Sequence, residues 1–526
     1  MSFICLPLLV NRREICVSGI ESLHVWQEQL TLSSDWRISE GLDAAITNRV
    51  LFTISLNDNS QAIQTQMSYI VYLDMHAVLL EDWVNNLDKL GVLLDQCSAR
   101  HPKVLLRCKD TDWRAWSRLK YRERVSVALD ITENATGGAL HRAWMVEPVE
   151  AIFFTSNQKP CAELHPTYDQ VKWTETENFK NSILINTPSL ASTTILDNHP
   201  VAPLQPLRDN LASSVYRVFE RDLCKYNLYQ DAIEASLRHL QKLKSPLLIG
   251  VLGGGRGPIV ERCVRVLDEL SLTAKVMVIE KNVNACLALL DRFSGDPRVS
   301  VQLGDMRDVE GLPKFDLIVS ELLGSFGDNE LAPECLWPAE VFLSEIGICI
   351  PKSYTSYVEP CYAPTVRRKC ADMQAMHVCR LTRALLHKSR TEQSQPVFCF
   401  HHPSLASERK SHLLNKIRFT IDEPYAVIDG LVGYFSCVLA NVAREGCVTM
   451  STRPEEQSSG LESWYPVYFP LQEPLHLENA APVSIAITIE RVRKDTRVWY
   501  EWKCEGHGVD ATITHNAGGT HQAFAL

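Results

Sequence analysis

Apolar and polar positions alternate differently in three successive parts of the chain. In the first part, residues 1–195, short apolar runs alternate with stretches of helical spacing, which predicts an α/β layer or a barrel. No group of residues there suggests catalysis, so a structural or partner-binding role is the simpler interpretation. The predicted strands are residues 1–10, 50–54, 69–73, 104–106, 125–129 and 151–154, and the predicted helices are residues 75–90 and 113–121.

The second part, residues 196–352, has continuous apolar runs separated by amphipathic stretches. Such runs are typical of strands buried on both faces of a parallel sheet. Their order, β-α-β-α-β-β with short connections, predicts a Rossmann-like, doubly wound nucleotide-binding domain. The predicted strands are 247–252, 275–279, 299–303 and 315–320, and the predicted helices are 229–243, 258–270 and 283–293.

The third part, residues 353–526, predicts an all-β domain, either a barrel or a sandwich. Its apolar runs alternate or carry β-branched and aromatic residues, and Gly, Pro and Asn interrupt them. Residues 365–395 are basic and helix-like, and a solvated face explains such a charge run best. The predicted strands are 418–421, 433–439, 465–469, 483–489 and 498–502.

Composition excludes several classes of function. The formal charge of −10 argues against a generic nucleic-acid binder, and it fits basic protein substrates as well as plain solubility. The 17 cysteines are scattered without CxxC pairs, so reduced thiols in a reducing compartment fit better than a metal site. No apolar run reaches the roughly 20 residues that a membrane-spanning helix needs.

The candidate chemistry starts in the loop after the strand at 315–320. Glu321 stands at the C-terminal tip of that strand, where open α/β sheets bind ligands, and Glu330 ends the loop. Gly324 and Gly327 allow the loop to turn back, so the second carboxylate can return beside the first. Two adjacent anions require a cation between them, and a guanidinium matches two carboxylates best.

A second group of candidate residues follows the neighbouring strands. Gly253, Gly255 and Gly257 form a turn followed by Pro, which differs from the GxGxxG pattern of dinucleotide enzymes and favours S-adenosylmethionine over NAD. Glu280 ends the next strand, where it can accept ribose hydroxyls. Asp305-Met306 ends the third strand, where an adenine edge would lie. Helix capping explains one such acid, but not acids at three successive strand ends.

These motifs resemble those of a known family. The run VSELLGSFGDNELAPECL, with VLGGGRGP upstream, resembles the protein arginine methyltransferases, specifically the type II enzymes that produce symmetric dimethylarginine. The resemblance covers residues 203–526. It implies a degenerate TIM-type barrel (1–195), a Rossmann-like methyltransferase domain (196–352) and a C-terminal β-barrel and oligomerisation domain (353–526), an α/β plus β fold.

The resemblance also implies a role for each matching residue. Glu321 and Glu330 would grip the substrate guanidinium, and Phe219 would set symmetric dimethylation. Leu204 and Trp464 would line the path of the substrate arginine. The implied contacts of S-adenosyl-L-methionine are Tyr216, Lys225, Tyr226, Gly253, Gly255, Glu280, Asp305 and Met306.

The family further implies basic Arg/Gly-rich substrates such as histone tails and RNA-binding proteins, homo-oligomers, and a location in cytoplasm and nucleus. Its N-terminal barrel docks a WD-repeat propeller partner, but this barrel looks shortened by whole strand-helix units. The family's Tyr-containing segment before Pro203 is replaced by residues 195–200, which hold no tyrosine. The alternatives are a catalytically weak paralogue that acts as a scaffold and, disfavoured by the glycine pattern, an NAD-dependent oxidoreductase.

Overall fold

The computed structural model divides the chain into two units, Met1–Ser192 and Thr193–Leu526. It describes residues 17–18, 52–64, 67, 77–96, 102–132, 144, 146–147, 149–155 and 198–526, except 309, 383, 388–392, 424, 479–481 and 507–509. The strands predicted at 1–10 and 69–73 lie outside these residues.

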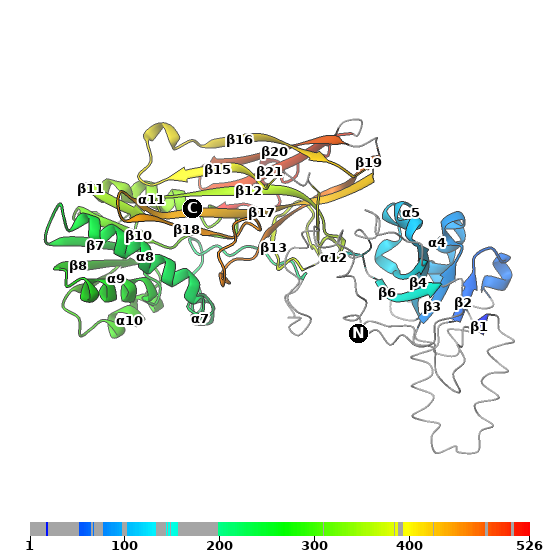
Figure 1. The fold of residues 1–526 in the computed structure, drawn as a ribbon, viewed down its shortest axis with the longest axis horizontal. Helices are drawn as coiled ribbons and strands as arrows, with labels where there is room; N and C mark the ends of the chain where they lie inside the picture. Colours follow the sequence, from blue (N-terminus) through cyan, green and yellow to red (C-terminus); the bar gives the residue numbers. More distant parts are fainter. Residues whose placement is uncertain are drawn as a thin grey trace, which may run out of the picture. The chain divides into compact units, whose positions relative to one another are not determined.

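The first unit contains a six-stranded parallel sheet with its strands in sequence order, β1 to β6 (Figure 1). One prediction there was wrong: within 75–90, residues 77–80 are consecutive buried apolar residues that form a strand, and the helix begins only at Leu87. The helix predicted at 113–121 ends at Ser117. The elements are β1 (Val17–Ser18), β2 (Phe52–Ser55), β3 (Ala77–Glu81), α4 (Leu87–Gln96), β4 (Lys103–Lys109), α5 (Trp113–Ser117), β5 (Ser126–Thr132) and β6 (Val149–Thr155).

The second unit begins with a five-stranded parallel sheet in the order β11-β10-β7-β8-β9. The chain starts at the central strand β7, so the order reverses between β7 and β10, and ligands of such sheets bind at that reversal. This confirms the predicted Rossmann-like sheet. The elements are α7 (Ser213–Phe219), α8 (Leu223–Leu240), β7 (Leu247–Leu252), α9 (Pro258–Glu269), β8 (Ala274–Glu280), α10 (Val283–Arg292), β9 (Val299–Leu303), β10 (Phe315–Ser320), α11 (Ala332–Ala339) and β11 (Leu343–Ile350).

Burial explains why the apolar runs became central strands. Every residue of β10 is buried, as an apolar run between two neighbouring strands requires. In α9 the residues Ile259, Cys263, Val266 and Leu267 are buried, as one face of an amphipathic helix requires. The helix predicted at 229–243 begins earlier, at Leu223, because Asp222 caps its first turn.

The C-terminal half of this unit is rich in β-structure, as predicted. The strand pairs among its described residues form two antiparallel sheets: β13-β19-β17-β12-β14, with β15 on β12 and β18 on β17, and β16-β20-β21-β22. The elements are β12 (Ser353–Tyr362), β13 (His377–Val378), β14 (Leu385–Leu386), β15 (Gln395–His401), β16 (His412–Ile421), β17 (Tyr425–Val442), β18 (Gly446–Ser451), β19 (Val467–Glu478), β20 (Val483–Lys494), β21 (Arg497–Gly506) and β22 (Phe524–Ala525).

The helical interpretation of 365–395 was wrong. Among the described residues of this stretch, only the short helix α12 (Pro364–Arg367) forms, and the strands β13 and β14 follow it. Met376, Leu381 and Ala384 are buried against the sheets, so tertiary packing overrides the helical preference of the basic residues around them.

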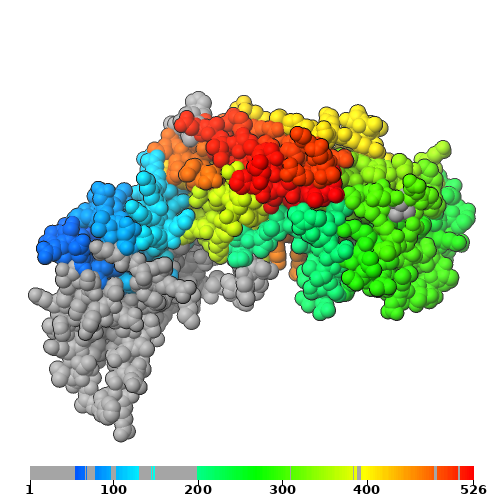
Figure 2. Space-filling model, turned by 180° about the vertical axis from the view of Figure 1, so that it is seen from behind, coloured from blue at the N-terminus to red at the C-terminus, as the bar shows by residue number. Residues whose placement is uncertain are grey.

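One apolar core joins the parallel sheet to the antiparallel sheets. Tyr229 of α8 and Val319 of β10 belong to the same buried cluster as Phe435 of β17 and Phe469 of β19. In the space-filling view the green surface of the parallel-sheet region continues into the yellow and red surface of the C-terminal strands (Figure 2). The second unit is therefore a single folding body in which the antiparallel sheets can supply residues to the ligand-binding edge.

Candidate active site

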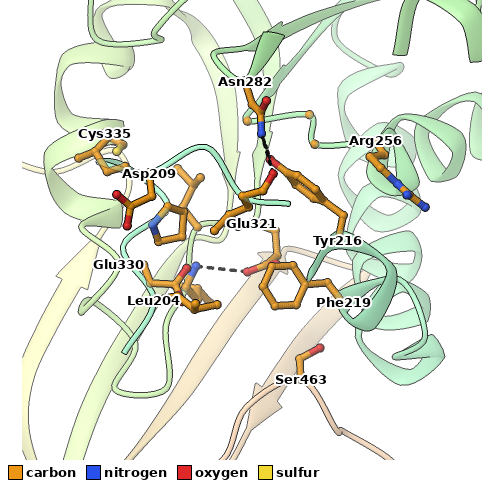
Figure 3. Close-up of a pocket in the computed structure, with 18 of the residues that line it drawn as sticks. Leu204, Asp209, Tyr216, Phe219, Arg256, Asn282, Glu321, Glu330, Cys335 and Ser463 are labelled. Carbon is orange, nitrogen blue, oxygen red and sulfur yellow. Dashed lines mark hydrogen bonds between the residues drawn. The ribbon is translucent and has the colours of Figure 1, made fainter. Parts of the chain in front are cut away.

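A cavity of about 480 Å³ opens at the reversal of strand order between β7 and β10. Side chains converge on it from several elements (Figure 3). All the site residues that the sequence predicted line this one cavity, which confirms that they lie together but leaves their individual roles untested. They are Leu204, Tyr216, Phe219, Lys225, Tyr226, Gly253, Gly255, Glu280, Asp305, Met306, Glu321, Glu330 and Trp464.

The glycine turn after β7 forms a floor that side chains would obstruct. Gly253 and Gly255 have φ angles of 78° and 54°, a region that favours glycine. A Cβ atom at Gly253 would lie 3.0 Å from Leu322, and one at Gly255 would lie 3.3 Å from the Tyr216 ring. These two positions keep the backbone open to a ligand, as a nucleoside-containing cofactor requires.

Glu280 holds the glycine turn in place. Its carboxylate accepts the amide N–H of Gly255 and that of Asn282, both at 2.7 Å. The cap of α10 is Asn282, so helix capping does not explain Glu280. Burial raises the pKa of Glu280, and the two amide donors oppose that shift. Asn282 also donates to the Tyr216 hydroxyl at 3.2 Å, a contact drawn in Figure 3.

Asp305 has a partner that sequence reasoning missed. Both of its oxygens accept hydrogen bonds from the guanidinium of Arg307, at 2.9 and 2.7 Å. Burial opposes ionisation, but the donors of Arg307 lower the pKa of Asp305. The spacing of two residues between an acid and a base was the available signal. Arg307 therefore fixes the carboxylate at the end of β9.

The loop of residues 321–330, called the carboxylate loop below, turns back as predicted. Gly324 and Gly327 exchange two backbone hydrogen bonds of 3.1 and 2.8 Å, and Gly327 has a φ of 83°. The Asn329 side chain accepts the amide of Phe326 at 2.7 Å. The turn places Glu330 back at the cavity that Glu321 lines.

A buried arginine from the antiparallel sheets anchors this loop. The guanidinium of Arg491 in β20 donates to Asp328, and it contacts both oxygens of Glu334 at 2.8 and 3.0 Å. Asp328 also accepts the hydroxyls of Tyr500 at 2.6 Å and Ser356 at 3.0 Å. A buried charge needs such a complete set of partners. No sequence signal pointed to Arg491, which lies far along the chain.

Lys225 lies at the centre of the cavity's aromatic wall. It is 1% exposed, and its ammonium is 3.2 Å from Glu321 Oε2. Three ring centroids surround the ammonium: Phe219 at 5.3 Å, Tyr226 at 4.8 Å and Trp464 at 5.0 Å. Aromatic faces attract cations, so this wall suits positively charged groups.

Glu330 has the most perturbed carboxyl group of the site. Burial and the neighbouring Glu321 carboxylate raise its pKa well above the ordinary value, although the charge of Lys225 opposes the shift. Burial and a neighbouring anion favour the protonated carboxyl group, and a bound cation would favour the carboxylate. The pair can therefore bind a guanidinium.

Metal chemistry and a membrane span have no support in the part of the chain that the structure describes. No cluster of three His, Cys, Asp or Glu side chains there could hold a metal ion. None of the described helices is long and apolar enough to cross a membrane.

Comparisons with known proteins follow the same division of the chain. Residues 191–350 match the family model described as PRMT5 arginine-N-methyltransferase, and residues 353–524 match the PRMT5 oligomerisation domain. Protein arginine N-methyltransferase 5 of Xenopus laevis is 30% identical over 442 residues, which cover 75% of this chain and 69% of the relative. The Drosophila melanogaster protein is 30% identical over 451 residues, 78% of this chain and 72% of the relative.

Other relatives match over a shorter span. The Oryza sativa subsp. indica protein is 36% identical over 318 residues, so the match spans 57% of this chain and 47% of the relative. Among solved structures, the Trypanosoma brucei PRMT1 enzyme-prozyme heterotetrameric complex with AdoHcy aligns with a TM-score of 0.47 and 13% identity over 60% of this chain and 98% of that one, values too low to support an argument.

Proposed function

Because the chain belongs to the PRMT5 family of S-adenosylmethionine-dependent protein arginine N-methyltransferases, we propose that it forms monomethylarginine and symmetric dimethylarginine on Arg/Gly-rich proteins. The observation that supports this most is the shared cavity. The carboxylate loop with Glu321 and Glu330 and the glycine turn with Glu280 line the same space, so a guanidinium site adjoins a nucleoside site.

The residues at the strand ends fit the methyl donor. Gly253 and Gly255 would leave room for it, Glu280 would bind its ribose, and Asp305 with Met306 would contact its adenine. Tyr216 and Tyr226 line the same cavity, and Lys225 would bind its carboxylate. S-Adenosyl-L-methionine supplies a methyl group that its sulfonium has already activated.

The protein's own residues then have to orient the arginine. Glu321 and Glu330 accept hydrogen bonds from the guanidinium and hold its charge on the nitrogens that do not react. Orientation supplies most of the rate in such a transfer, since the nitrogen lone pair must point at the methyl carbon. In this proposal the carboxylate of Glu330 accepts the proton that the guanidinium loses as the methyl group is transferred.

Three further residues would select substrate and product. The ring centroids of Phe219 and Trp464 lie 5.3 and 5.0 Å from the Lys225 ammonium. In this proposal the Phe219 ring limits which nitrogen of the guanidinium can approach the methyl group. Leu204 lines the same cavity and would contact the aliphatic part of the arginine.

Properties of the whole protein extend this proposal. The match of residues 353–524 to an oligomerisation domain supports a homo-oligomer. The six parallel strands in sequence order support a TIM-type barrel in residues 1–195, followed by a methyltransferase domain (196–352) and a β-barrel domain (353–526). Histone tails and RNA-binding proteins are the proposed substrates, in cytoplasm and nucleus. A WD-repeat partner of the barrel is the least supported part of this proposal.

Labelled S-adenosylmethionine with the purified protein and an Arg/Gly-rich histone tail peptide tests the proposal. We expect transfer to arginine and a symmetric dimethyl product by mass spectrometry. Glu330→Gln should abolish transfer while cofactor affinity stays unchanged, because the amide cannot neutralise a guanidinium. Undiminished turnover in that variant would rule out the assigned role. Cofactor binding without any transfer by the wild type would favour the scaffold alternative.

A further inference from the structure

A single buried carboxylate joins the two parts of the chain that line the aromatic end of the cavity. Asp222 is 3% exposed and precedes α8. Its Oδ1 accepts the amide of Lys225 at 3.0 Å, which caps the helix. Its Oδ2 accepts the amides of Glu462 at 2.9 Å and Ser463 at 2.7 Å, in the loop between β18 and β19. Although burial opposes ionisation, these donors lower the pKa of Asp222.

The tethered loop carries Trp464 as its next residue. The indole Nε1 of Trp464 donates to the carbonyl of Leu323 in the carboxylate loop at 2.8 Å. Its ring also packs edge-on against Phe435 at 5.1 Å. Trp464 is thus fixed against the carboxylate loop by its own side chain. Its loop is fixed against α8 by the backbone amides that Asp222 accepts and by the Cys224 thiol, which donates to the carbonyl of Ser459 at 3.2 Å.

Asp222 also lies between two residues of the aromatic wall in sequence. Phe219 precedes it by one helical turn, and Lys225 follows it by the same spacing. The Lys225 ammonium is 5.3 Å from the Phe219 ring and 5.0 Å from the Trp464 ring. The distance between those two rings therefore depends in part on the carboxylate that binds both segments.

We propose that Asp222 is a positioning residue for the substrate arginine. It acts through Trp464: by holding the backbone at 462–463 against the start of α8, it sets the separation of Trp464 from Phe219. This proposal rests on the methyltransferase function proposed above. In this proposal Asp222 influences the affinity for the arginine side chain and the ratio of monomethyl to dimethyl product. It makes no contact with the cofactor.

Two substitutions separate the two functions of Asp222: it caps α8, and it holds the backbone amides of residues 462–463, a contact called the tether below. Serine is a good N-cap, so Asp222→Ser retains an acceptor for the Lys225 amide, but it is too short to reach the amides of residues 462–463 as well. Asp222→Ala removes both functions. Leu267→Ala serves as a destabilised control, because Leu267 is buried in α9 and does not line the cavity.

Hydrogen exchange followed by mass spectrometry tests the tether independently of activity. In Asp222→Ser, amides in residues 458–466 should exchange faster than in the wild type, while those of α8 stay protected. Unchanged exchange in residues 458–466 would overturn the proposal. Leu267→Ala should not accelerate this segment selectively.

Steady-state kinetics tests the positioning role. Asp222→Ser should raise the KM for the arginine peptide about tenfold, because a displaced Trp464 no longer lines the path of the arginine, and it should raise the monomethyl share of the product. Its affinity for S-adenosylmethionine should stay within about twofold of the wild type. A peptide KM and product ratio like those of the wild type, in an active enzyme, would refute the proposal. A wild type that transfers no methyl group to arginine would instead refute the proposed function, and the exchange experiment would still decide whether the tether exists.

Discussion

At the scale of single residues, the sequence placed the cavity's lining correctly and missed the residues that hold it. Glu280, Asp305 and Glu321 were predictable because each follows a strand whose apolar run is evident. Asp222 and Arg491 were not, because their partners lie far away: Asp222 binds an amide 241 positions later, and Arg491 binds Asp328 across 163 positions. Local sequence patterns identify residues that line the ligand cavity. The residues that hold these in place depend on contacts between distant parts of the chain.

The raised pKa of Glu330 predicts that arginine binding releases a proton. The free enzyme holds the proton because burial and Glu321 disfavour the anion, and a bound guanidinium favours the anion. The peptide KM should therefore fall as the pH rises through the raised pKa. Calorimetry in two buffers of different ionisation enthalpy should give binding enthalpies that differ.

Glu321→Gln provides the comparison for this effect. It removes the neighbouring charge, so the pKa of Glu330 falls and fewer protons are released at the same pH. Binding enthalpies that do not depend on the buffer would show that Glu330 is already ionised in the free enzyme. The raised pKa of Glu330 also affects stability. The folded state binds more protons than the unfolded state, so the contribution of Glu330 to the free energy of unfolding declines as the pH rises.

The ring of Phe219 should determine the product. In Phe219→Met the side chain is flexible and no longer planar, so it restricts the guanidinium less. We expect a smaller share of symmetric dimethylarginine by mass spectrometry. Phe293→Met is the control, because Phe293 packs beside Gly257 outside the cavity. An unchanged share of the symmetric product in Phe219→Met would remove Phe219 from this role.

At the scale of elements, long apolar runs gave reliable predictions, and mixed stretches did not. The strands at 247–252 and 315–320 have the predicted bounds, since their continuous apolar runs fit the interior of the sheet. The strand at 299–303 also has its predicted bounds, although its apolar and polar residues alternate and it lies at the edge of the sheet. The helix predictions for residues 75–90 and 365–395 were wrong for the same reason. Their charges and helix-forming residues suggested helices, but burial of a few apolar side chains decided their structure.

The glycine turn provides a prediction with a matched control. Gly253→Ala should weaken the binding of S-adenosylmethionine by about tenfold or more, because the added Cβ projects into the cavity floor at a positive φ. Gly311→Ala imposes a similar strain, with a φ of 71° against 78°, but its Cβ would meet no atom within 4 Å. Thermal unfolding should show a similar loss of stability in both variants. Titration calorimetry should show weaker binding of S-adenosylmethionine in Gly253→Ala alone.

At the scale of the whole molecule, the sequence predicted a parallel sheet followed by β-rich structure, but not how the two combine. In residues 193–526 the parallel and antiparallel sheets share one core. The predicted C-terminal barrel consists of two sheets in its described residues. Such pairings depend on which strands meet in space, and alternation along one strand carries no information about its neighbours.

The shared core predicts that the two halves of this unit cannot fold separately. A fragment of residues 193–526 should unfold in one cooperative transition in urea, followed by circular dichroism. Fragments 193–352 and 353–526 should show none, because each exposes half of the core and leaves Asp328 and Glu334, or Arg491, without a partner, a loss of about 3–5 kcal/mol. A cooperative transition in fragment 193–352 would contradict this.

The contacts of Arg491 with Asp328 and Glu334 can form only late in the synthesis of the chain. During synthesis the carboxylate loop leaves the ribosome long before β20, and the last predicted site residue, Trp464, also precedes Arg491. A nascent or truncated chain ending between residues 464 and 491 would therefore carry all of the predicted site residues, while its carboxylate loop lacked the guanidinium that fixes it. Such a chain should be silent, and the ability to methylate should appear only when nearly the whole protein has been made.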